Sequence, residues 1–233
     1  MNLETKNKHQ GFTLLELLIV IAIIAVLSVA LVFVLNPAET LKKSRDAQRI
    51  SDLSAIKTAL GLYTTSVNPI YLGGTASNAT CRDSAGAWTS ADRIYYSYPS
   101  DSPGAAITDA TLDGGSASAP ASSQVVNANL ALTDGTGWVP VNLDNISGGS
   151  PISNLPIDPS NTIPTAALTA MDNTALVYRY ACRADNLTSE FDVPLESTAY
   201  TVDDNKLTKD GGNNSSFYEV GSNLKILGSG NNF

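Results

Sequence analysis

The residue types that carry most enzymatic chemistry are scarce in this sequence. Its single histidine, His9, lies at the extreme amino end of a 233-residue chain. Histidine is the usual general base near neutral pH and the commonest metal ligand. Ser-His-Asp hydrolysis, Cys-His catalysis and histidine-ligated zinc are therefore nearly excluded if the first dozen residues are removed. The chain also has no GxSxG, Walker A or dinucleotide-binding fingerprint, so we predict that it is not an enzyme.

The two cysteines, Cys81 and Cys182, are 101 positions apart and belong to no CxxC motif. In an exported protein an isolated pair of this kind is typical of a structural disulfide. The alternative is a pair of buried free thiols. We expect the disulfide if this part of the chain leaves the cytoplasm.

The apolar residues of the chain are distributed unevenly, with a long apolar segment near the amino end. Residues 12–35 read FTLLELLIVIAIIAVLSVALVFVL, 24 residues with the single charge of Glu16. As a helix this segment is about 36 Å long, enough to cross a hydrocarbon core of about 30 Å. We therefore predict a membrane-spanning helix. A cleaved secretory signal is the alternative, but the apolar run is longer than the usual 7–15 residues of such signals.

An amphipathic helix is predicted directly afterwards, over residues 36–66. Asn36, Pro37 and Glu39 are typical of a helix start, where the long helix either kinks or restarts. One apolar stripe follows at helical spacing, formed by Ile50, Leu53, Ile56, Leu60 and Tyr63. Together the two segments predict a nearly continuous helix of about 80 Å.

A basic group lies on the second of these segments: Lys42, Lys43, Arg45 and Arg49. Binding to acidic lipid head groups or to DNA is one interpretation. A solvated helix face at the membrane boundary explains the group more simply. Residues 61–233 carry a net charge of −10, so no nucleic-acid partner is expected.

The junction Gly11-Phe12-Thr13-Leu14-Leu15-Glu16 resembles the processing site of type IV pilins and of the pseudopilins of type II secretion. The resemblance covers residues 1–66, and a weaker one to the major pseudopilins rests on residues 155–159. It implies that a prepilin peptidase cuts between Gly11 and Phe12 and N-methylates Phe12. The leader, residues 1–11 with His9, would be lost. It also implies that the leader faces the cytoplasm and the head the outside.

Glu16 has two interpretations. With Thr13 it forms the pattern of a capping box, which explains an acid at a helix start. A carboxylate in a membrane segment is costly, however, and usually has a partner. The resemblance supplies one, the amine of Phe12 on a neighbouring subunit, which makes Phe12 and Glu16 assembly residues.

Residues 67–233 predict an exported head with long irregular loops. Short strands are expected at 93–98, 175–182, 190–195 and 217–220, a short helix at 124–132 and a buried extended segment at 138–143. Residues 100–123 predict an exposed loop. The fold class is α+β, with the long N-terminal helix packed on a small antiparallel sheet.

No cofactor is expected, although calcium is a candidate by resemblance to some pseudopilins. The aspartates considered, without assigned ligands, are Asp158, Asp185, Asp192, Asp203, Asp204 and Asp210. None forms an EF-hand loop, and Asp beside Gly and Asn is ordinary in turns.

The predicted function is a structural subunit of a type IV pilus-like or type II secretion pseudopilus filament. The resemblance implies, as partners, other pilin subunits, prepilin peptidase, an assembly ATPase with its platform, and membrane lipid before assembly. The protein would start in the cytoplasmic membrane and end in an extracellular or periplasmic filament. The alternative is a single-pass anchored binding module that does not polymerise.

Overall fold

The computed structural model describes residues 11–83, 88–101, 106–107, 121–163, 167–168 and 174–228. The chain divides into two units, Met1–Leu41 and Lys42–Phe233. His9 and all but the last residue of the predicted leader lie outside the described residues. Most of the loop predicted at 100–123 does so too, and the prediction is wrong for residues 106–107 and 121–123, which form short strands.

The first helix, α1 (Leu14–Leu35), ends at Asn36, and α2 (Pro37–Ser66) begins directly after it. Asn36 adopts a left-handed conformation with φ of 37°, which interrupts the α-helical path. Its carbonyl and side-chain oxygens both accept hydrogen bonds from the first turn of α2, including the N–H of Glu39. The sequence therefore predicted the helix start correctly, and the two helices are separate elements.

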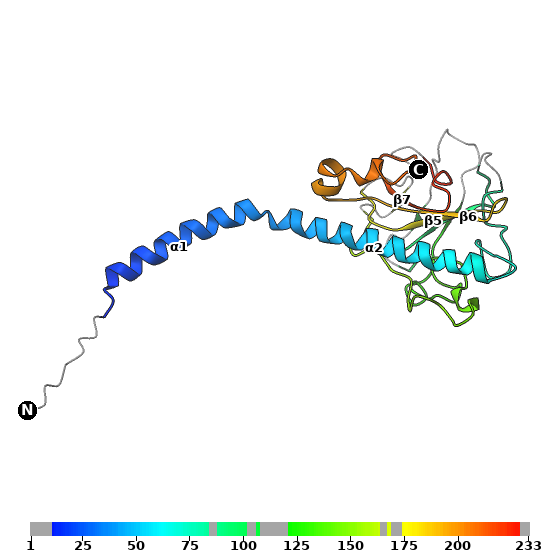
Figure 1. The fold of residues 1–233 in the computed structure, drawn as a ribbon, viewed down its shortest axis with the longest axis horizontal. Helices are drawn as coiled ribbons and strands as arrows, with labels where there is room; N and C mark the ends of the chain where they lie inside the picture. Colours follow the sequence, from blue (N-terminus) through cyan, green and yellow to red (C-terminus); the bar gives the residue numbers. More distant parts are fainter. Residues whose placement is uncertain are drawn as a thin grey trace, which may run out of the picture. The chain divides into compact units, whose positions relative to one another are not determined.

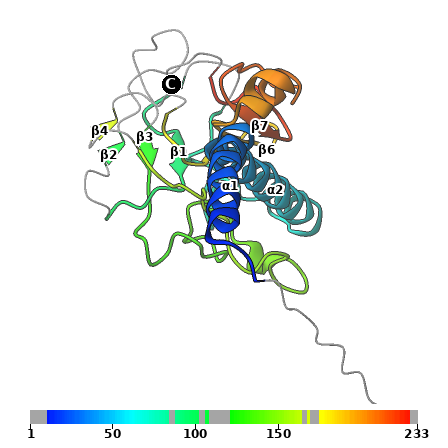
Figure 2. The same cartoon turned by 90° about the vertical axis from the view of Figure 1, so that its left-hand side faces the viewer.

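The head contains a five-stranded sheet in the order β3-β1-β5-β6-β7. Its strands are β1 (Arg93–Tyr96), β3 (Ala121–Ser123), β5 (Arg179–Arg183), β6 (Thr188–Val193) and β7 (Tyr218–Gly221). Four of them, β1, β5, β6 and β7, pair antiparallel. The edge strand β3 lies beside β1 (Figure 2) and pairs with it in parallel. The predicted α+β class with a small antiparallel sheet is confirmed, and the parallel edge strand is an addition.

Smaller elements lie in the connections between these strands. A second, two-stranded parallel sheet joins β2 (Ala106–Ile107) to β4 (Ala167–Leu168). The described part of the chain also contains the 3₁₀ turns η1 (Leu143–Asn145) and η3 (Lys206–Thr208) and the π-helical turn η2 (Ala199–Asp203).

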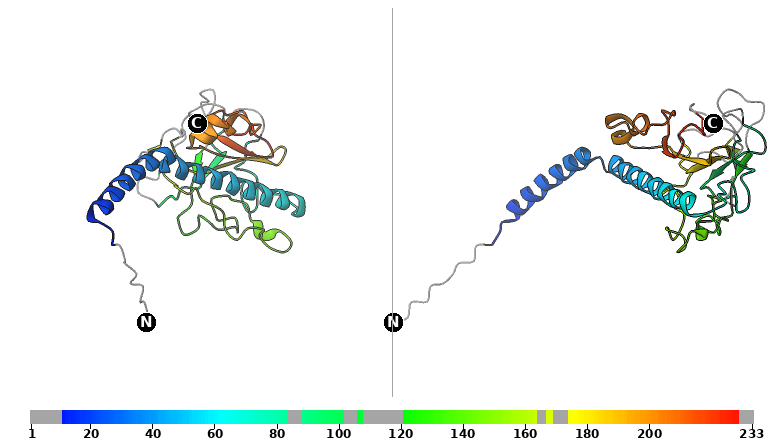
Figure 3. Two further views of the ribbon diagram at one scale, coloured as in Figure 1. Left: turned by 60° about the vertical axis from the view of Figure 1, so that its left-hand side comes forward. Right: turned by 45° about the vertical axis from the view of Figure 1, so that its right-hand side comes forward.

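The main core forms where α2 crosses the sheet (Figures 1 and 3). Four of the five predicted stripe residues, from Leu53 to Tyr63, are buried there. They lie in one cluster with the sheet aromatics Tyr180 and Phe191, whose ring centres are 4.8 Å apart. Trp138 from the predicted buried segment 138–143 packs edge-on against Phe191. Helical periodicity therefore identified the correct face of α2.

The helix predicted at 124–132 is wrong, because this segment forms turns. Its carbonyl groups are used by distant residues: Ser100 donates to Val125, Trp138 to Leu130 and Leu155 to Ala131. Within the segment the N–H groups of Asn129, Leu130 and Leu132 donate to carbonyls three positions earlier, which is the pattern of successive turns and not the i+4 pattern of an α-helix. The strand predicted from residue 175 also begins later, at Arg179.

Candidate functional site

The predicted processing site lies ahead of α1 in an open stretch of chain. Phe12 is 90% exposed. A Cβ added at Gly11 would meet no heavy atom within 4 Å among the described residues. Among the described residues, no packed side chain covers Gly11 or Phe12.

Glu16 and Thr13 form the predicted capping box at the start of α1. Thr13 donates its backbone N–H and its hydroxyl to Oε2 of Glu16, at 2.9 and 2.8 Å. In return the Glu16 N–H donates to Oγ1 of Thr13 at 3.2 Å. The carboxylate thus satisfies donors that a helix start leaves without intrahelical partners.

The surface around this carboxylate is apolar on every side of the helix. Each large apolar side chain between Phe12 and Leu31 is at least 49% exposed. Within the described residues, α1 is the one helix long and apolar enough to cross a membrane. An apolar surface of this extent requires lipid or other helices around it.

The basic group on α2 differs from the prediction. Arg49 is fully buried, so the expectation of a solvated face is wrong for this residue. It lies one turn before Leu53 on the face that contacts the head, and its guanidinium meets three carboxylates: Asp46, Asp158 and Glu196. Burial disfavours its charge, but the hydrogen bonds that Arg49 donates to these carboxylates, together with their negative charge, outweigh that effect and raise the pKa of Arg49.

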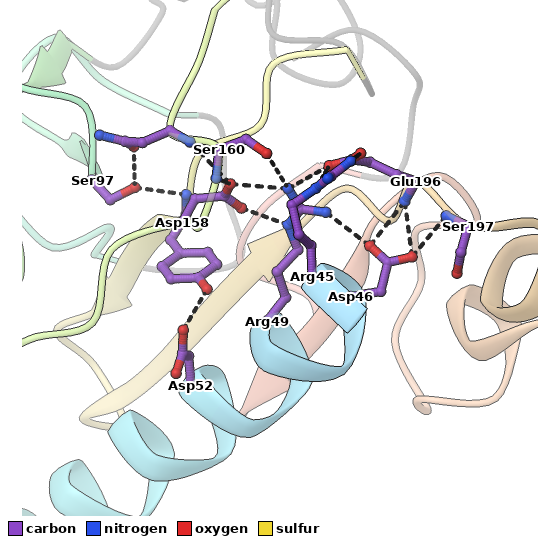
Figure 4. A network of polar contacts seen from close by, with 11 residues as sticks. Arg45, Asp46, Arg49, Asp52, Ser97, Asp158, Ser160, Glu196 and Ser197 are labelled. Carbon is purple, nitrogen blue, oxygen red and sulfur yellow. Dashed lines mark hydrogen bonds and ion pairs between the residues drawn. The ribbon is translucent and has the colours of Figure 1, made fainter. Parts of the chain in front are cut away.

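The cluster around Arg49 joins α2 to two segments of the head (Figure 4). Asp46 on α2 accepts the backbone N–H groups of Glu196 and Ser197 at 3.0 and 2.7 Å. Arg45, whose side chain is one third exposed, also forms an ion pair with Glu196. The segment after β6 and the loop carrying Asp158 are thereby fixed to α2. Sequence analysis missed Asp46 and Glu196 as members, although the i,i+3 spacing of Asp46 and Arg49 is a recognisable ion-pair pattern.

The remaining basic residues of the group behave differently. Lys43 is exposed, and its Nζ lies 5.9 Å from the ring centre of Tyr200. Lys42 is half-buried. The expected solvated basic face is therefore divided between two lysines, one exposed and one half-buried, and two arginines that bind carboxylates of the same chain.

Cys81 and Cys182 are joined in a disulfide. The neighbouring backbones are also paired, since the N–H of Arg82 donates to the Cys182 carbonyl and the N–H of Ala184 to the Arg82 carbonyl, both at 2.9 Å. The segment that follows α2 is thus attached covalently to β5.

Most of the aspartates considered for calcium are engaged within the protein. Three of them form ion pairs with arginines: Asp158 with Arg49, Asp185 with Arg183, and Asp192 with Arg179. A fourth, Asp204, pairs with Lys206 and Lys209. Asp210 accepts two backbone N–H groups. In the part of the chain that the structure describes, no group of three or more His, Cys, Asp or Glu side chains is arranged to hold a metal ion.

Residues 6–32 match the family model described as the prokaryotic N-terminal methylation motif. This motif is the prepilin-type signal of type IV pilins and pseudopilins, and it includes Gly11, Phe12 and Glu16. It implies processing by prepilin peptidase and belongs to structural rather than enzymatic proteins. No curated protein and no solved structure matches the chain.

Proposed function

We propose that this chain, which carries the prepilin-type signal, is a structural subunit of a type IV pilus-like or type II secretion pseudopilus filament. One observation supports this most directly. The signal coincides with a helix that is apolar and uncovered on all sides, with a single carboxylate in its first turn. A membrane anchor needs only the apolar helix, whereas a filament also needs a feature that sets the position of neighbouring subunits.

Processing would supply that feature. Cleavage between Gly11 and Phe12 creates a new amine four residues before Glu16, and N-methylation leaves this amine cationic. Both hydrogen bonds that the Glu16 carboxylate accepts among the described residues use Oε2. Oε1 can then accept the Phe12 amine of a neighbouring subunit while the cap remains intact. Pairing would offset the cost of a carboxylate in an apolar environment.

The same helix would serve in two environments. Before assembly its apolar surface contacts lipid, with the leader in the cytoplasm and the head outside. An assembly ATPase and its platform would then extract the subunit, and helix–helix packing would replace the lipid contacts. The head would remain on the outside of the filament, extracellular or periplasmic.

The amino terminus of the native protein tests the processing step. Mass spectrometry is expected to find N-methyl-Phe12 as the first residue. An intact Met1 would instead support the alternative of a single-pass anchored binding module. A chain that starts after Ala30 would indicate a secreted domain.

Two substitutions of Glu16 separate assembly from capping. Glu16→Gln keeps an oxygen acceptor for Thr13, because glutamine also completes a capping box, but removes the charge. Glu16→Val removes both. We expect both variants to be cleaved and inserted but to assemble poorly, as measured by filament recovery from the cell surface. Glu39→Gln, in the first turn of α2, is the matched control and should assemble normally. Normal filaments from Glu16→Gln would show that Glu16 acts as a cap only.

A further inference from the structure

A cavity of about 190 Å³ lies between the last part of α2 and the adjoining ends of β6 and β7. Its apolar lining includes Leu60 and Phe191, both buried, and Leu187 in the turn before β6. A cavity of roughly 150 Å³ is enough to hold a small apolar group such as benzene. The cavity on the head is therefore large enough to accept an aliphatic side chain from outside the subunit.

Two backbone features at this cavity are unfavourable for the fold of the head. Gly61 lies in the interior of α2, where glycine stabilises a helix less than alanine does. A Cβ at this position would meet no heavy atom within 4 Å among the described residues, so packing within the head does not require glycine. Leu187 has a φ of 52°, a left-handed conformation that is rare for leucine. Unfavourable conformations of this kind are often retained at functional surfaces.

The rim of the cavity is polar and carries a positive charge. Lys57 and Thr64, both on α2, belong to it. Lys57 is exposed and forms no ion pair with any other described residue. An occupant that joins an apolar side chain to a neighbouring carboxylate would therefore complement both the lining and the rim.

The turn η2 carries a pair of residues with these properties, Val202 and Asp203. Val202 is 68% exposed, more than any other large apolar side chain described between residues 42 and 233. Asp203 is exposed and, within the described part of the chain, forms no ion pair. The turn is held against α2, because Tyr200 contacts Lys43.

The position of η2 along α2 prevents this pair from reaching the cavity of its own subunit. Tyr200 lies beside Lys43, whereas the part of α2 that lines the cavity begins at Lys57, fourteen residues later. This separation is about 21 Å along the helix axis. A contact between two different surfaces of the same chain is heterologous, and it can repeat from one subunit to the next as it does in a filament.

We propose that the cavity receives Val202 of a second copy of this chain, and that Asp203 of that copy pairs with Lys57 on the rim. The inference rests on the proposed filament and assigns a contact between heads, in addition to the pairing of Glu16 with the Phe12 amine. Leu60 and Phe191 would remove the exposed valine from water, which favours association. The ion pair would fix which way the incoming turn faces.

Disulfide crosslinking of assembled filaments tests the contact directly. Cys81 and Cys182 are already paired, so oxidation joins only introduced cysteines. In filaments of the full chain with Val202→Cys and Thr64→Cys, we expect mild oxidation to give a ladder of multimers on a non-reducing gel. The matched control combines Thr64→Cys with Val126→Cys, because Val126 is another exposed apolar residue of the head. This control should give no ladder.

Charge reversal tests the ion pair on the rim. Lys57→Glu and Asp203→Lys should each lower filament recovery about fivefold, as expected for the loss of a surface ion pair. The combination of both substitutions should restore recovery, because it recreates the pair with the charges exchanged. Loss of a fold would not be reversed in this way.

Filling the cavity gives a variant that should fold normally. Gly61→Leu places a side chain at the mouth of the cavity, where a Cβ has free space. We expect the melting temperature of the full chain in detergent to be unchanged or higher, since leucine favours a helix more than glycine does. Filament recovery should fall nevertheless, because the valine of the neighbour can no longer enter.

The outcomes separate this proposal from the proposed filament. Native filaments that begin with N-methyl-Phe12, but no ladder from the Val202→Cys/Thr64→Cys variant, would overturn the contact and leave the filament standing. If Gly61→Leu also fails to assemble in that case, another segment or another protein occupies the cavity. An equal ladder from the Val126→Cys control, or no recovery in the double charge reversal, would overturn the contact as well. A native chain that forms no filament would overturn both proposals.

Discussion

The guanidinium of Arg49 contacts both carboxylate oxygens of Asp158, which lies 109 positions later in the sequence. Nε is 2.6 Å from Oδ2 and Nη2 is 2.9 Å from Oδ1, a bidentate arrangement that fixes the direction as well as the distance of the pair. Because both side chains are fully buried, α2 and the loop of Asp158 are held together by ionic contacts as well as by the apolar stripe.

Replacing Arg49 by alanine should destabilise the head strongly. The change leaves Asp158 and Asp46 buried without their cation, and breaking a buried pair in this way costs about 3–5 kcal/mol. The free energy of unfolding of the full chain in detergent, measured with urea, checks this. Lys57→Ala, at an exposed position of α2, is the control. A loss no larger than that of the control would mean that the cluster contributes little to stability.

Glu196 should make stability depend on pH in the acidic range. Burial opposes its ionisation, but hydrogen bonds from Arg45 and Arg49 outweigh burial and lower the pKa of Glu196 below its usual 4.5. Its contribution is therefore present above about pH 4.5 and is lost as the pH falls further. We expect Glu196→Gln to lower the melting temperature at pH 6, with the difference shrinking below pH 4. A difference that is constant with pH would contradict this assignment.

Reduction of the Cys81–Cys182 disulfide should weaken the head without altering the apolar helix α1. The bond closes a loop of 101 positions, for which chain entropy sets an upper limit of about 4–5 kcal/mol. Thiol-specific mass labelling of the native chain should detect no thiol until reductant is added. The Cys81→Ser/Cys182→Ser variant should then melt at the temperature of the reduced protein. Labelling of both thiols without reductant would show that the pair is not oxidised in the cell.

Calcium should leave the melting temperature of the metal-stripped protein unchanged. The aspartates considered as ligands are mostly bound to arginine, lysine or backbone N–H groups, which a cation would have to displace. Titration with calcium during thermal unfolding measures this, with magnesium as the comparison. A rise that is specific to calcium would establish a site and revise the present expectation.

Local patterns in the sequence predicted the parts of the fold that depend on neighbouring residues. The 3.6-residue spacing from Leu53 to Tyr63 identified the buried face of α2, and Asn36-Pro37 identified its start. The capping box could be read from Thr13 and Glu16 because its partners are three positions apart. The strands near Tyr180, Phe191 and Val220 were located within a few residues.

Contacts between distant residues could not be predicted in this way. Arg49 resembled any solvent-facing arginine, because its partners Asp158 and Glu196 are more than a hundred positions away. The parallel pairing of β3 with β1 could not be predicted for the same reason, because it joins segments that are far apart in the sequence. The turns at residues 124–132 are also hydrogen-bonded to Ser100, Trp138 and Leu155, which lie outside the segment from which a helix was predicted.

The uniform apolar surface of α1 has a consequence for how subunits would meet. A helix with one apolar face and one polar face has a fixed rotational orientation about its own axis in a bilayer, since rotation would expose polar groups to hydrocarbon. Large apolar side chains are exposed along α1 from Leu14 to Leu31, so lipid does not favour any one rotational orientation of this helix about its axis. Rotation of α1 about its own axis would therefore cost little free energy in the membrane. The side of α1 that contacts a neighbouring subunit would then be determined by packing against that subunit and not by lipid.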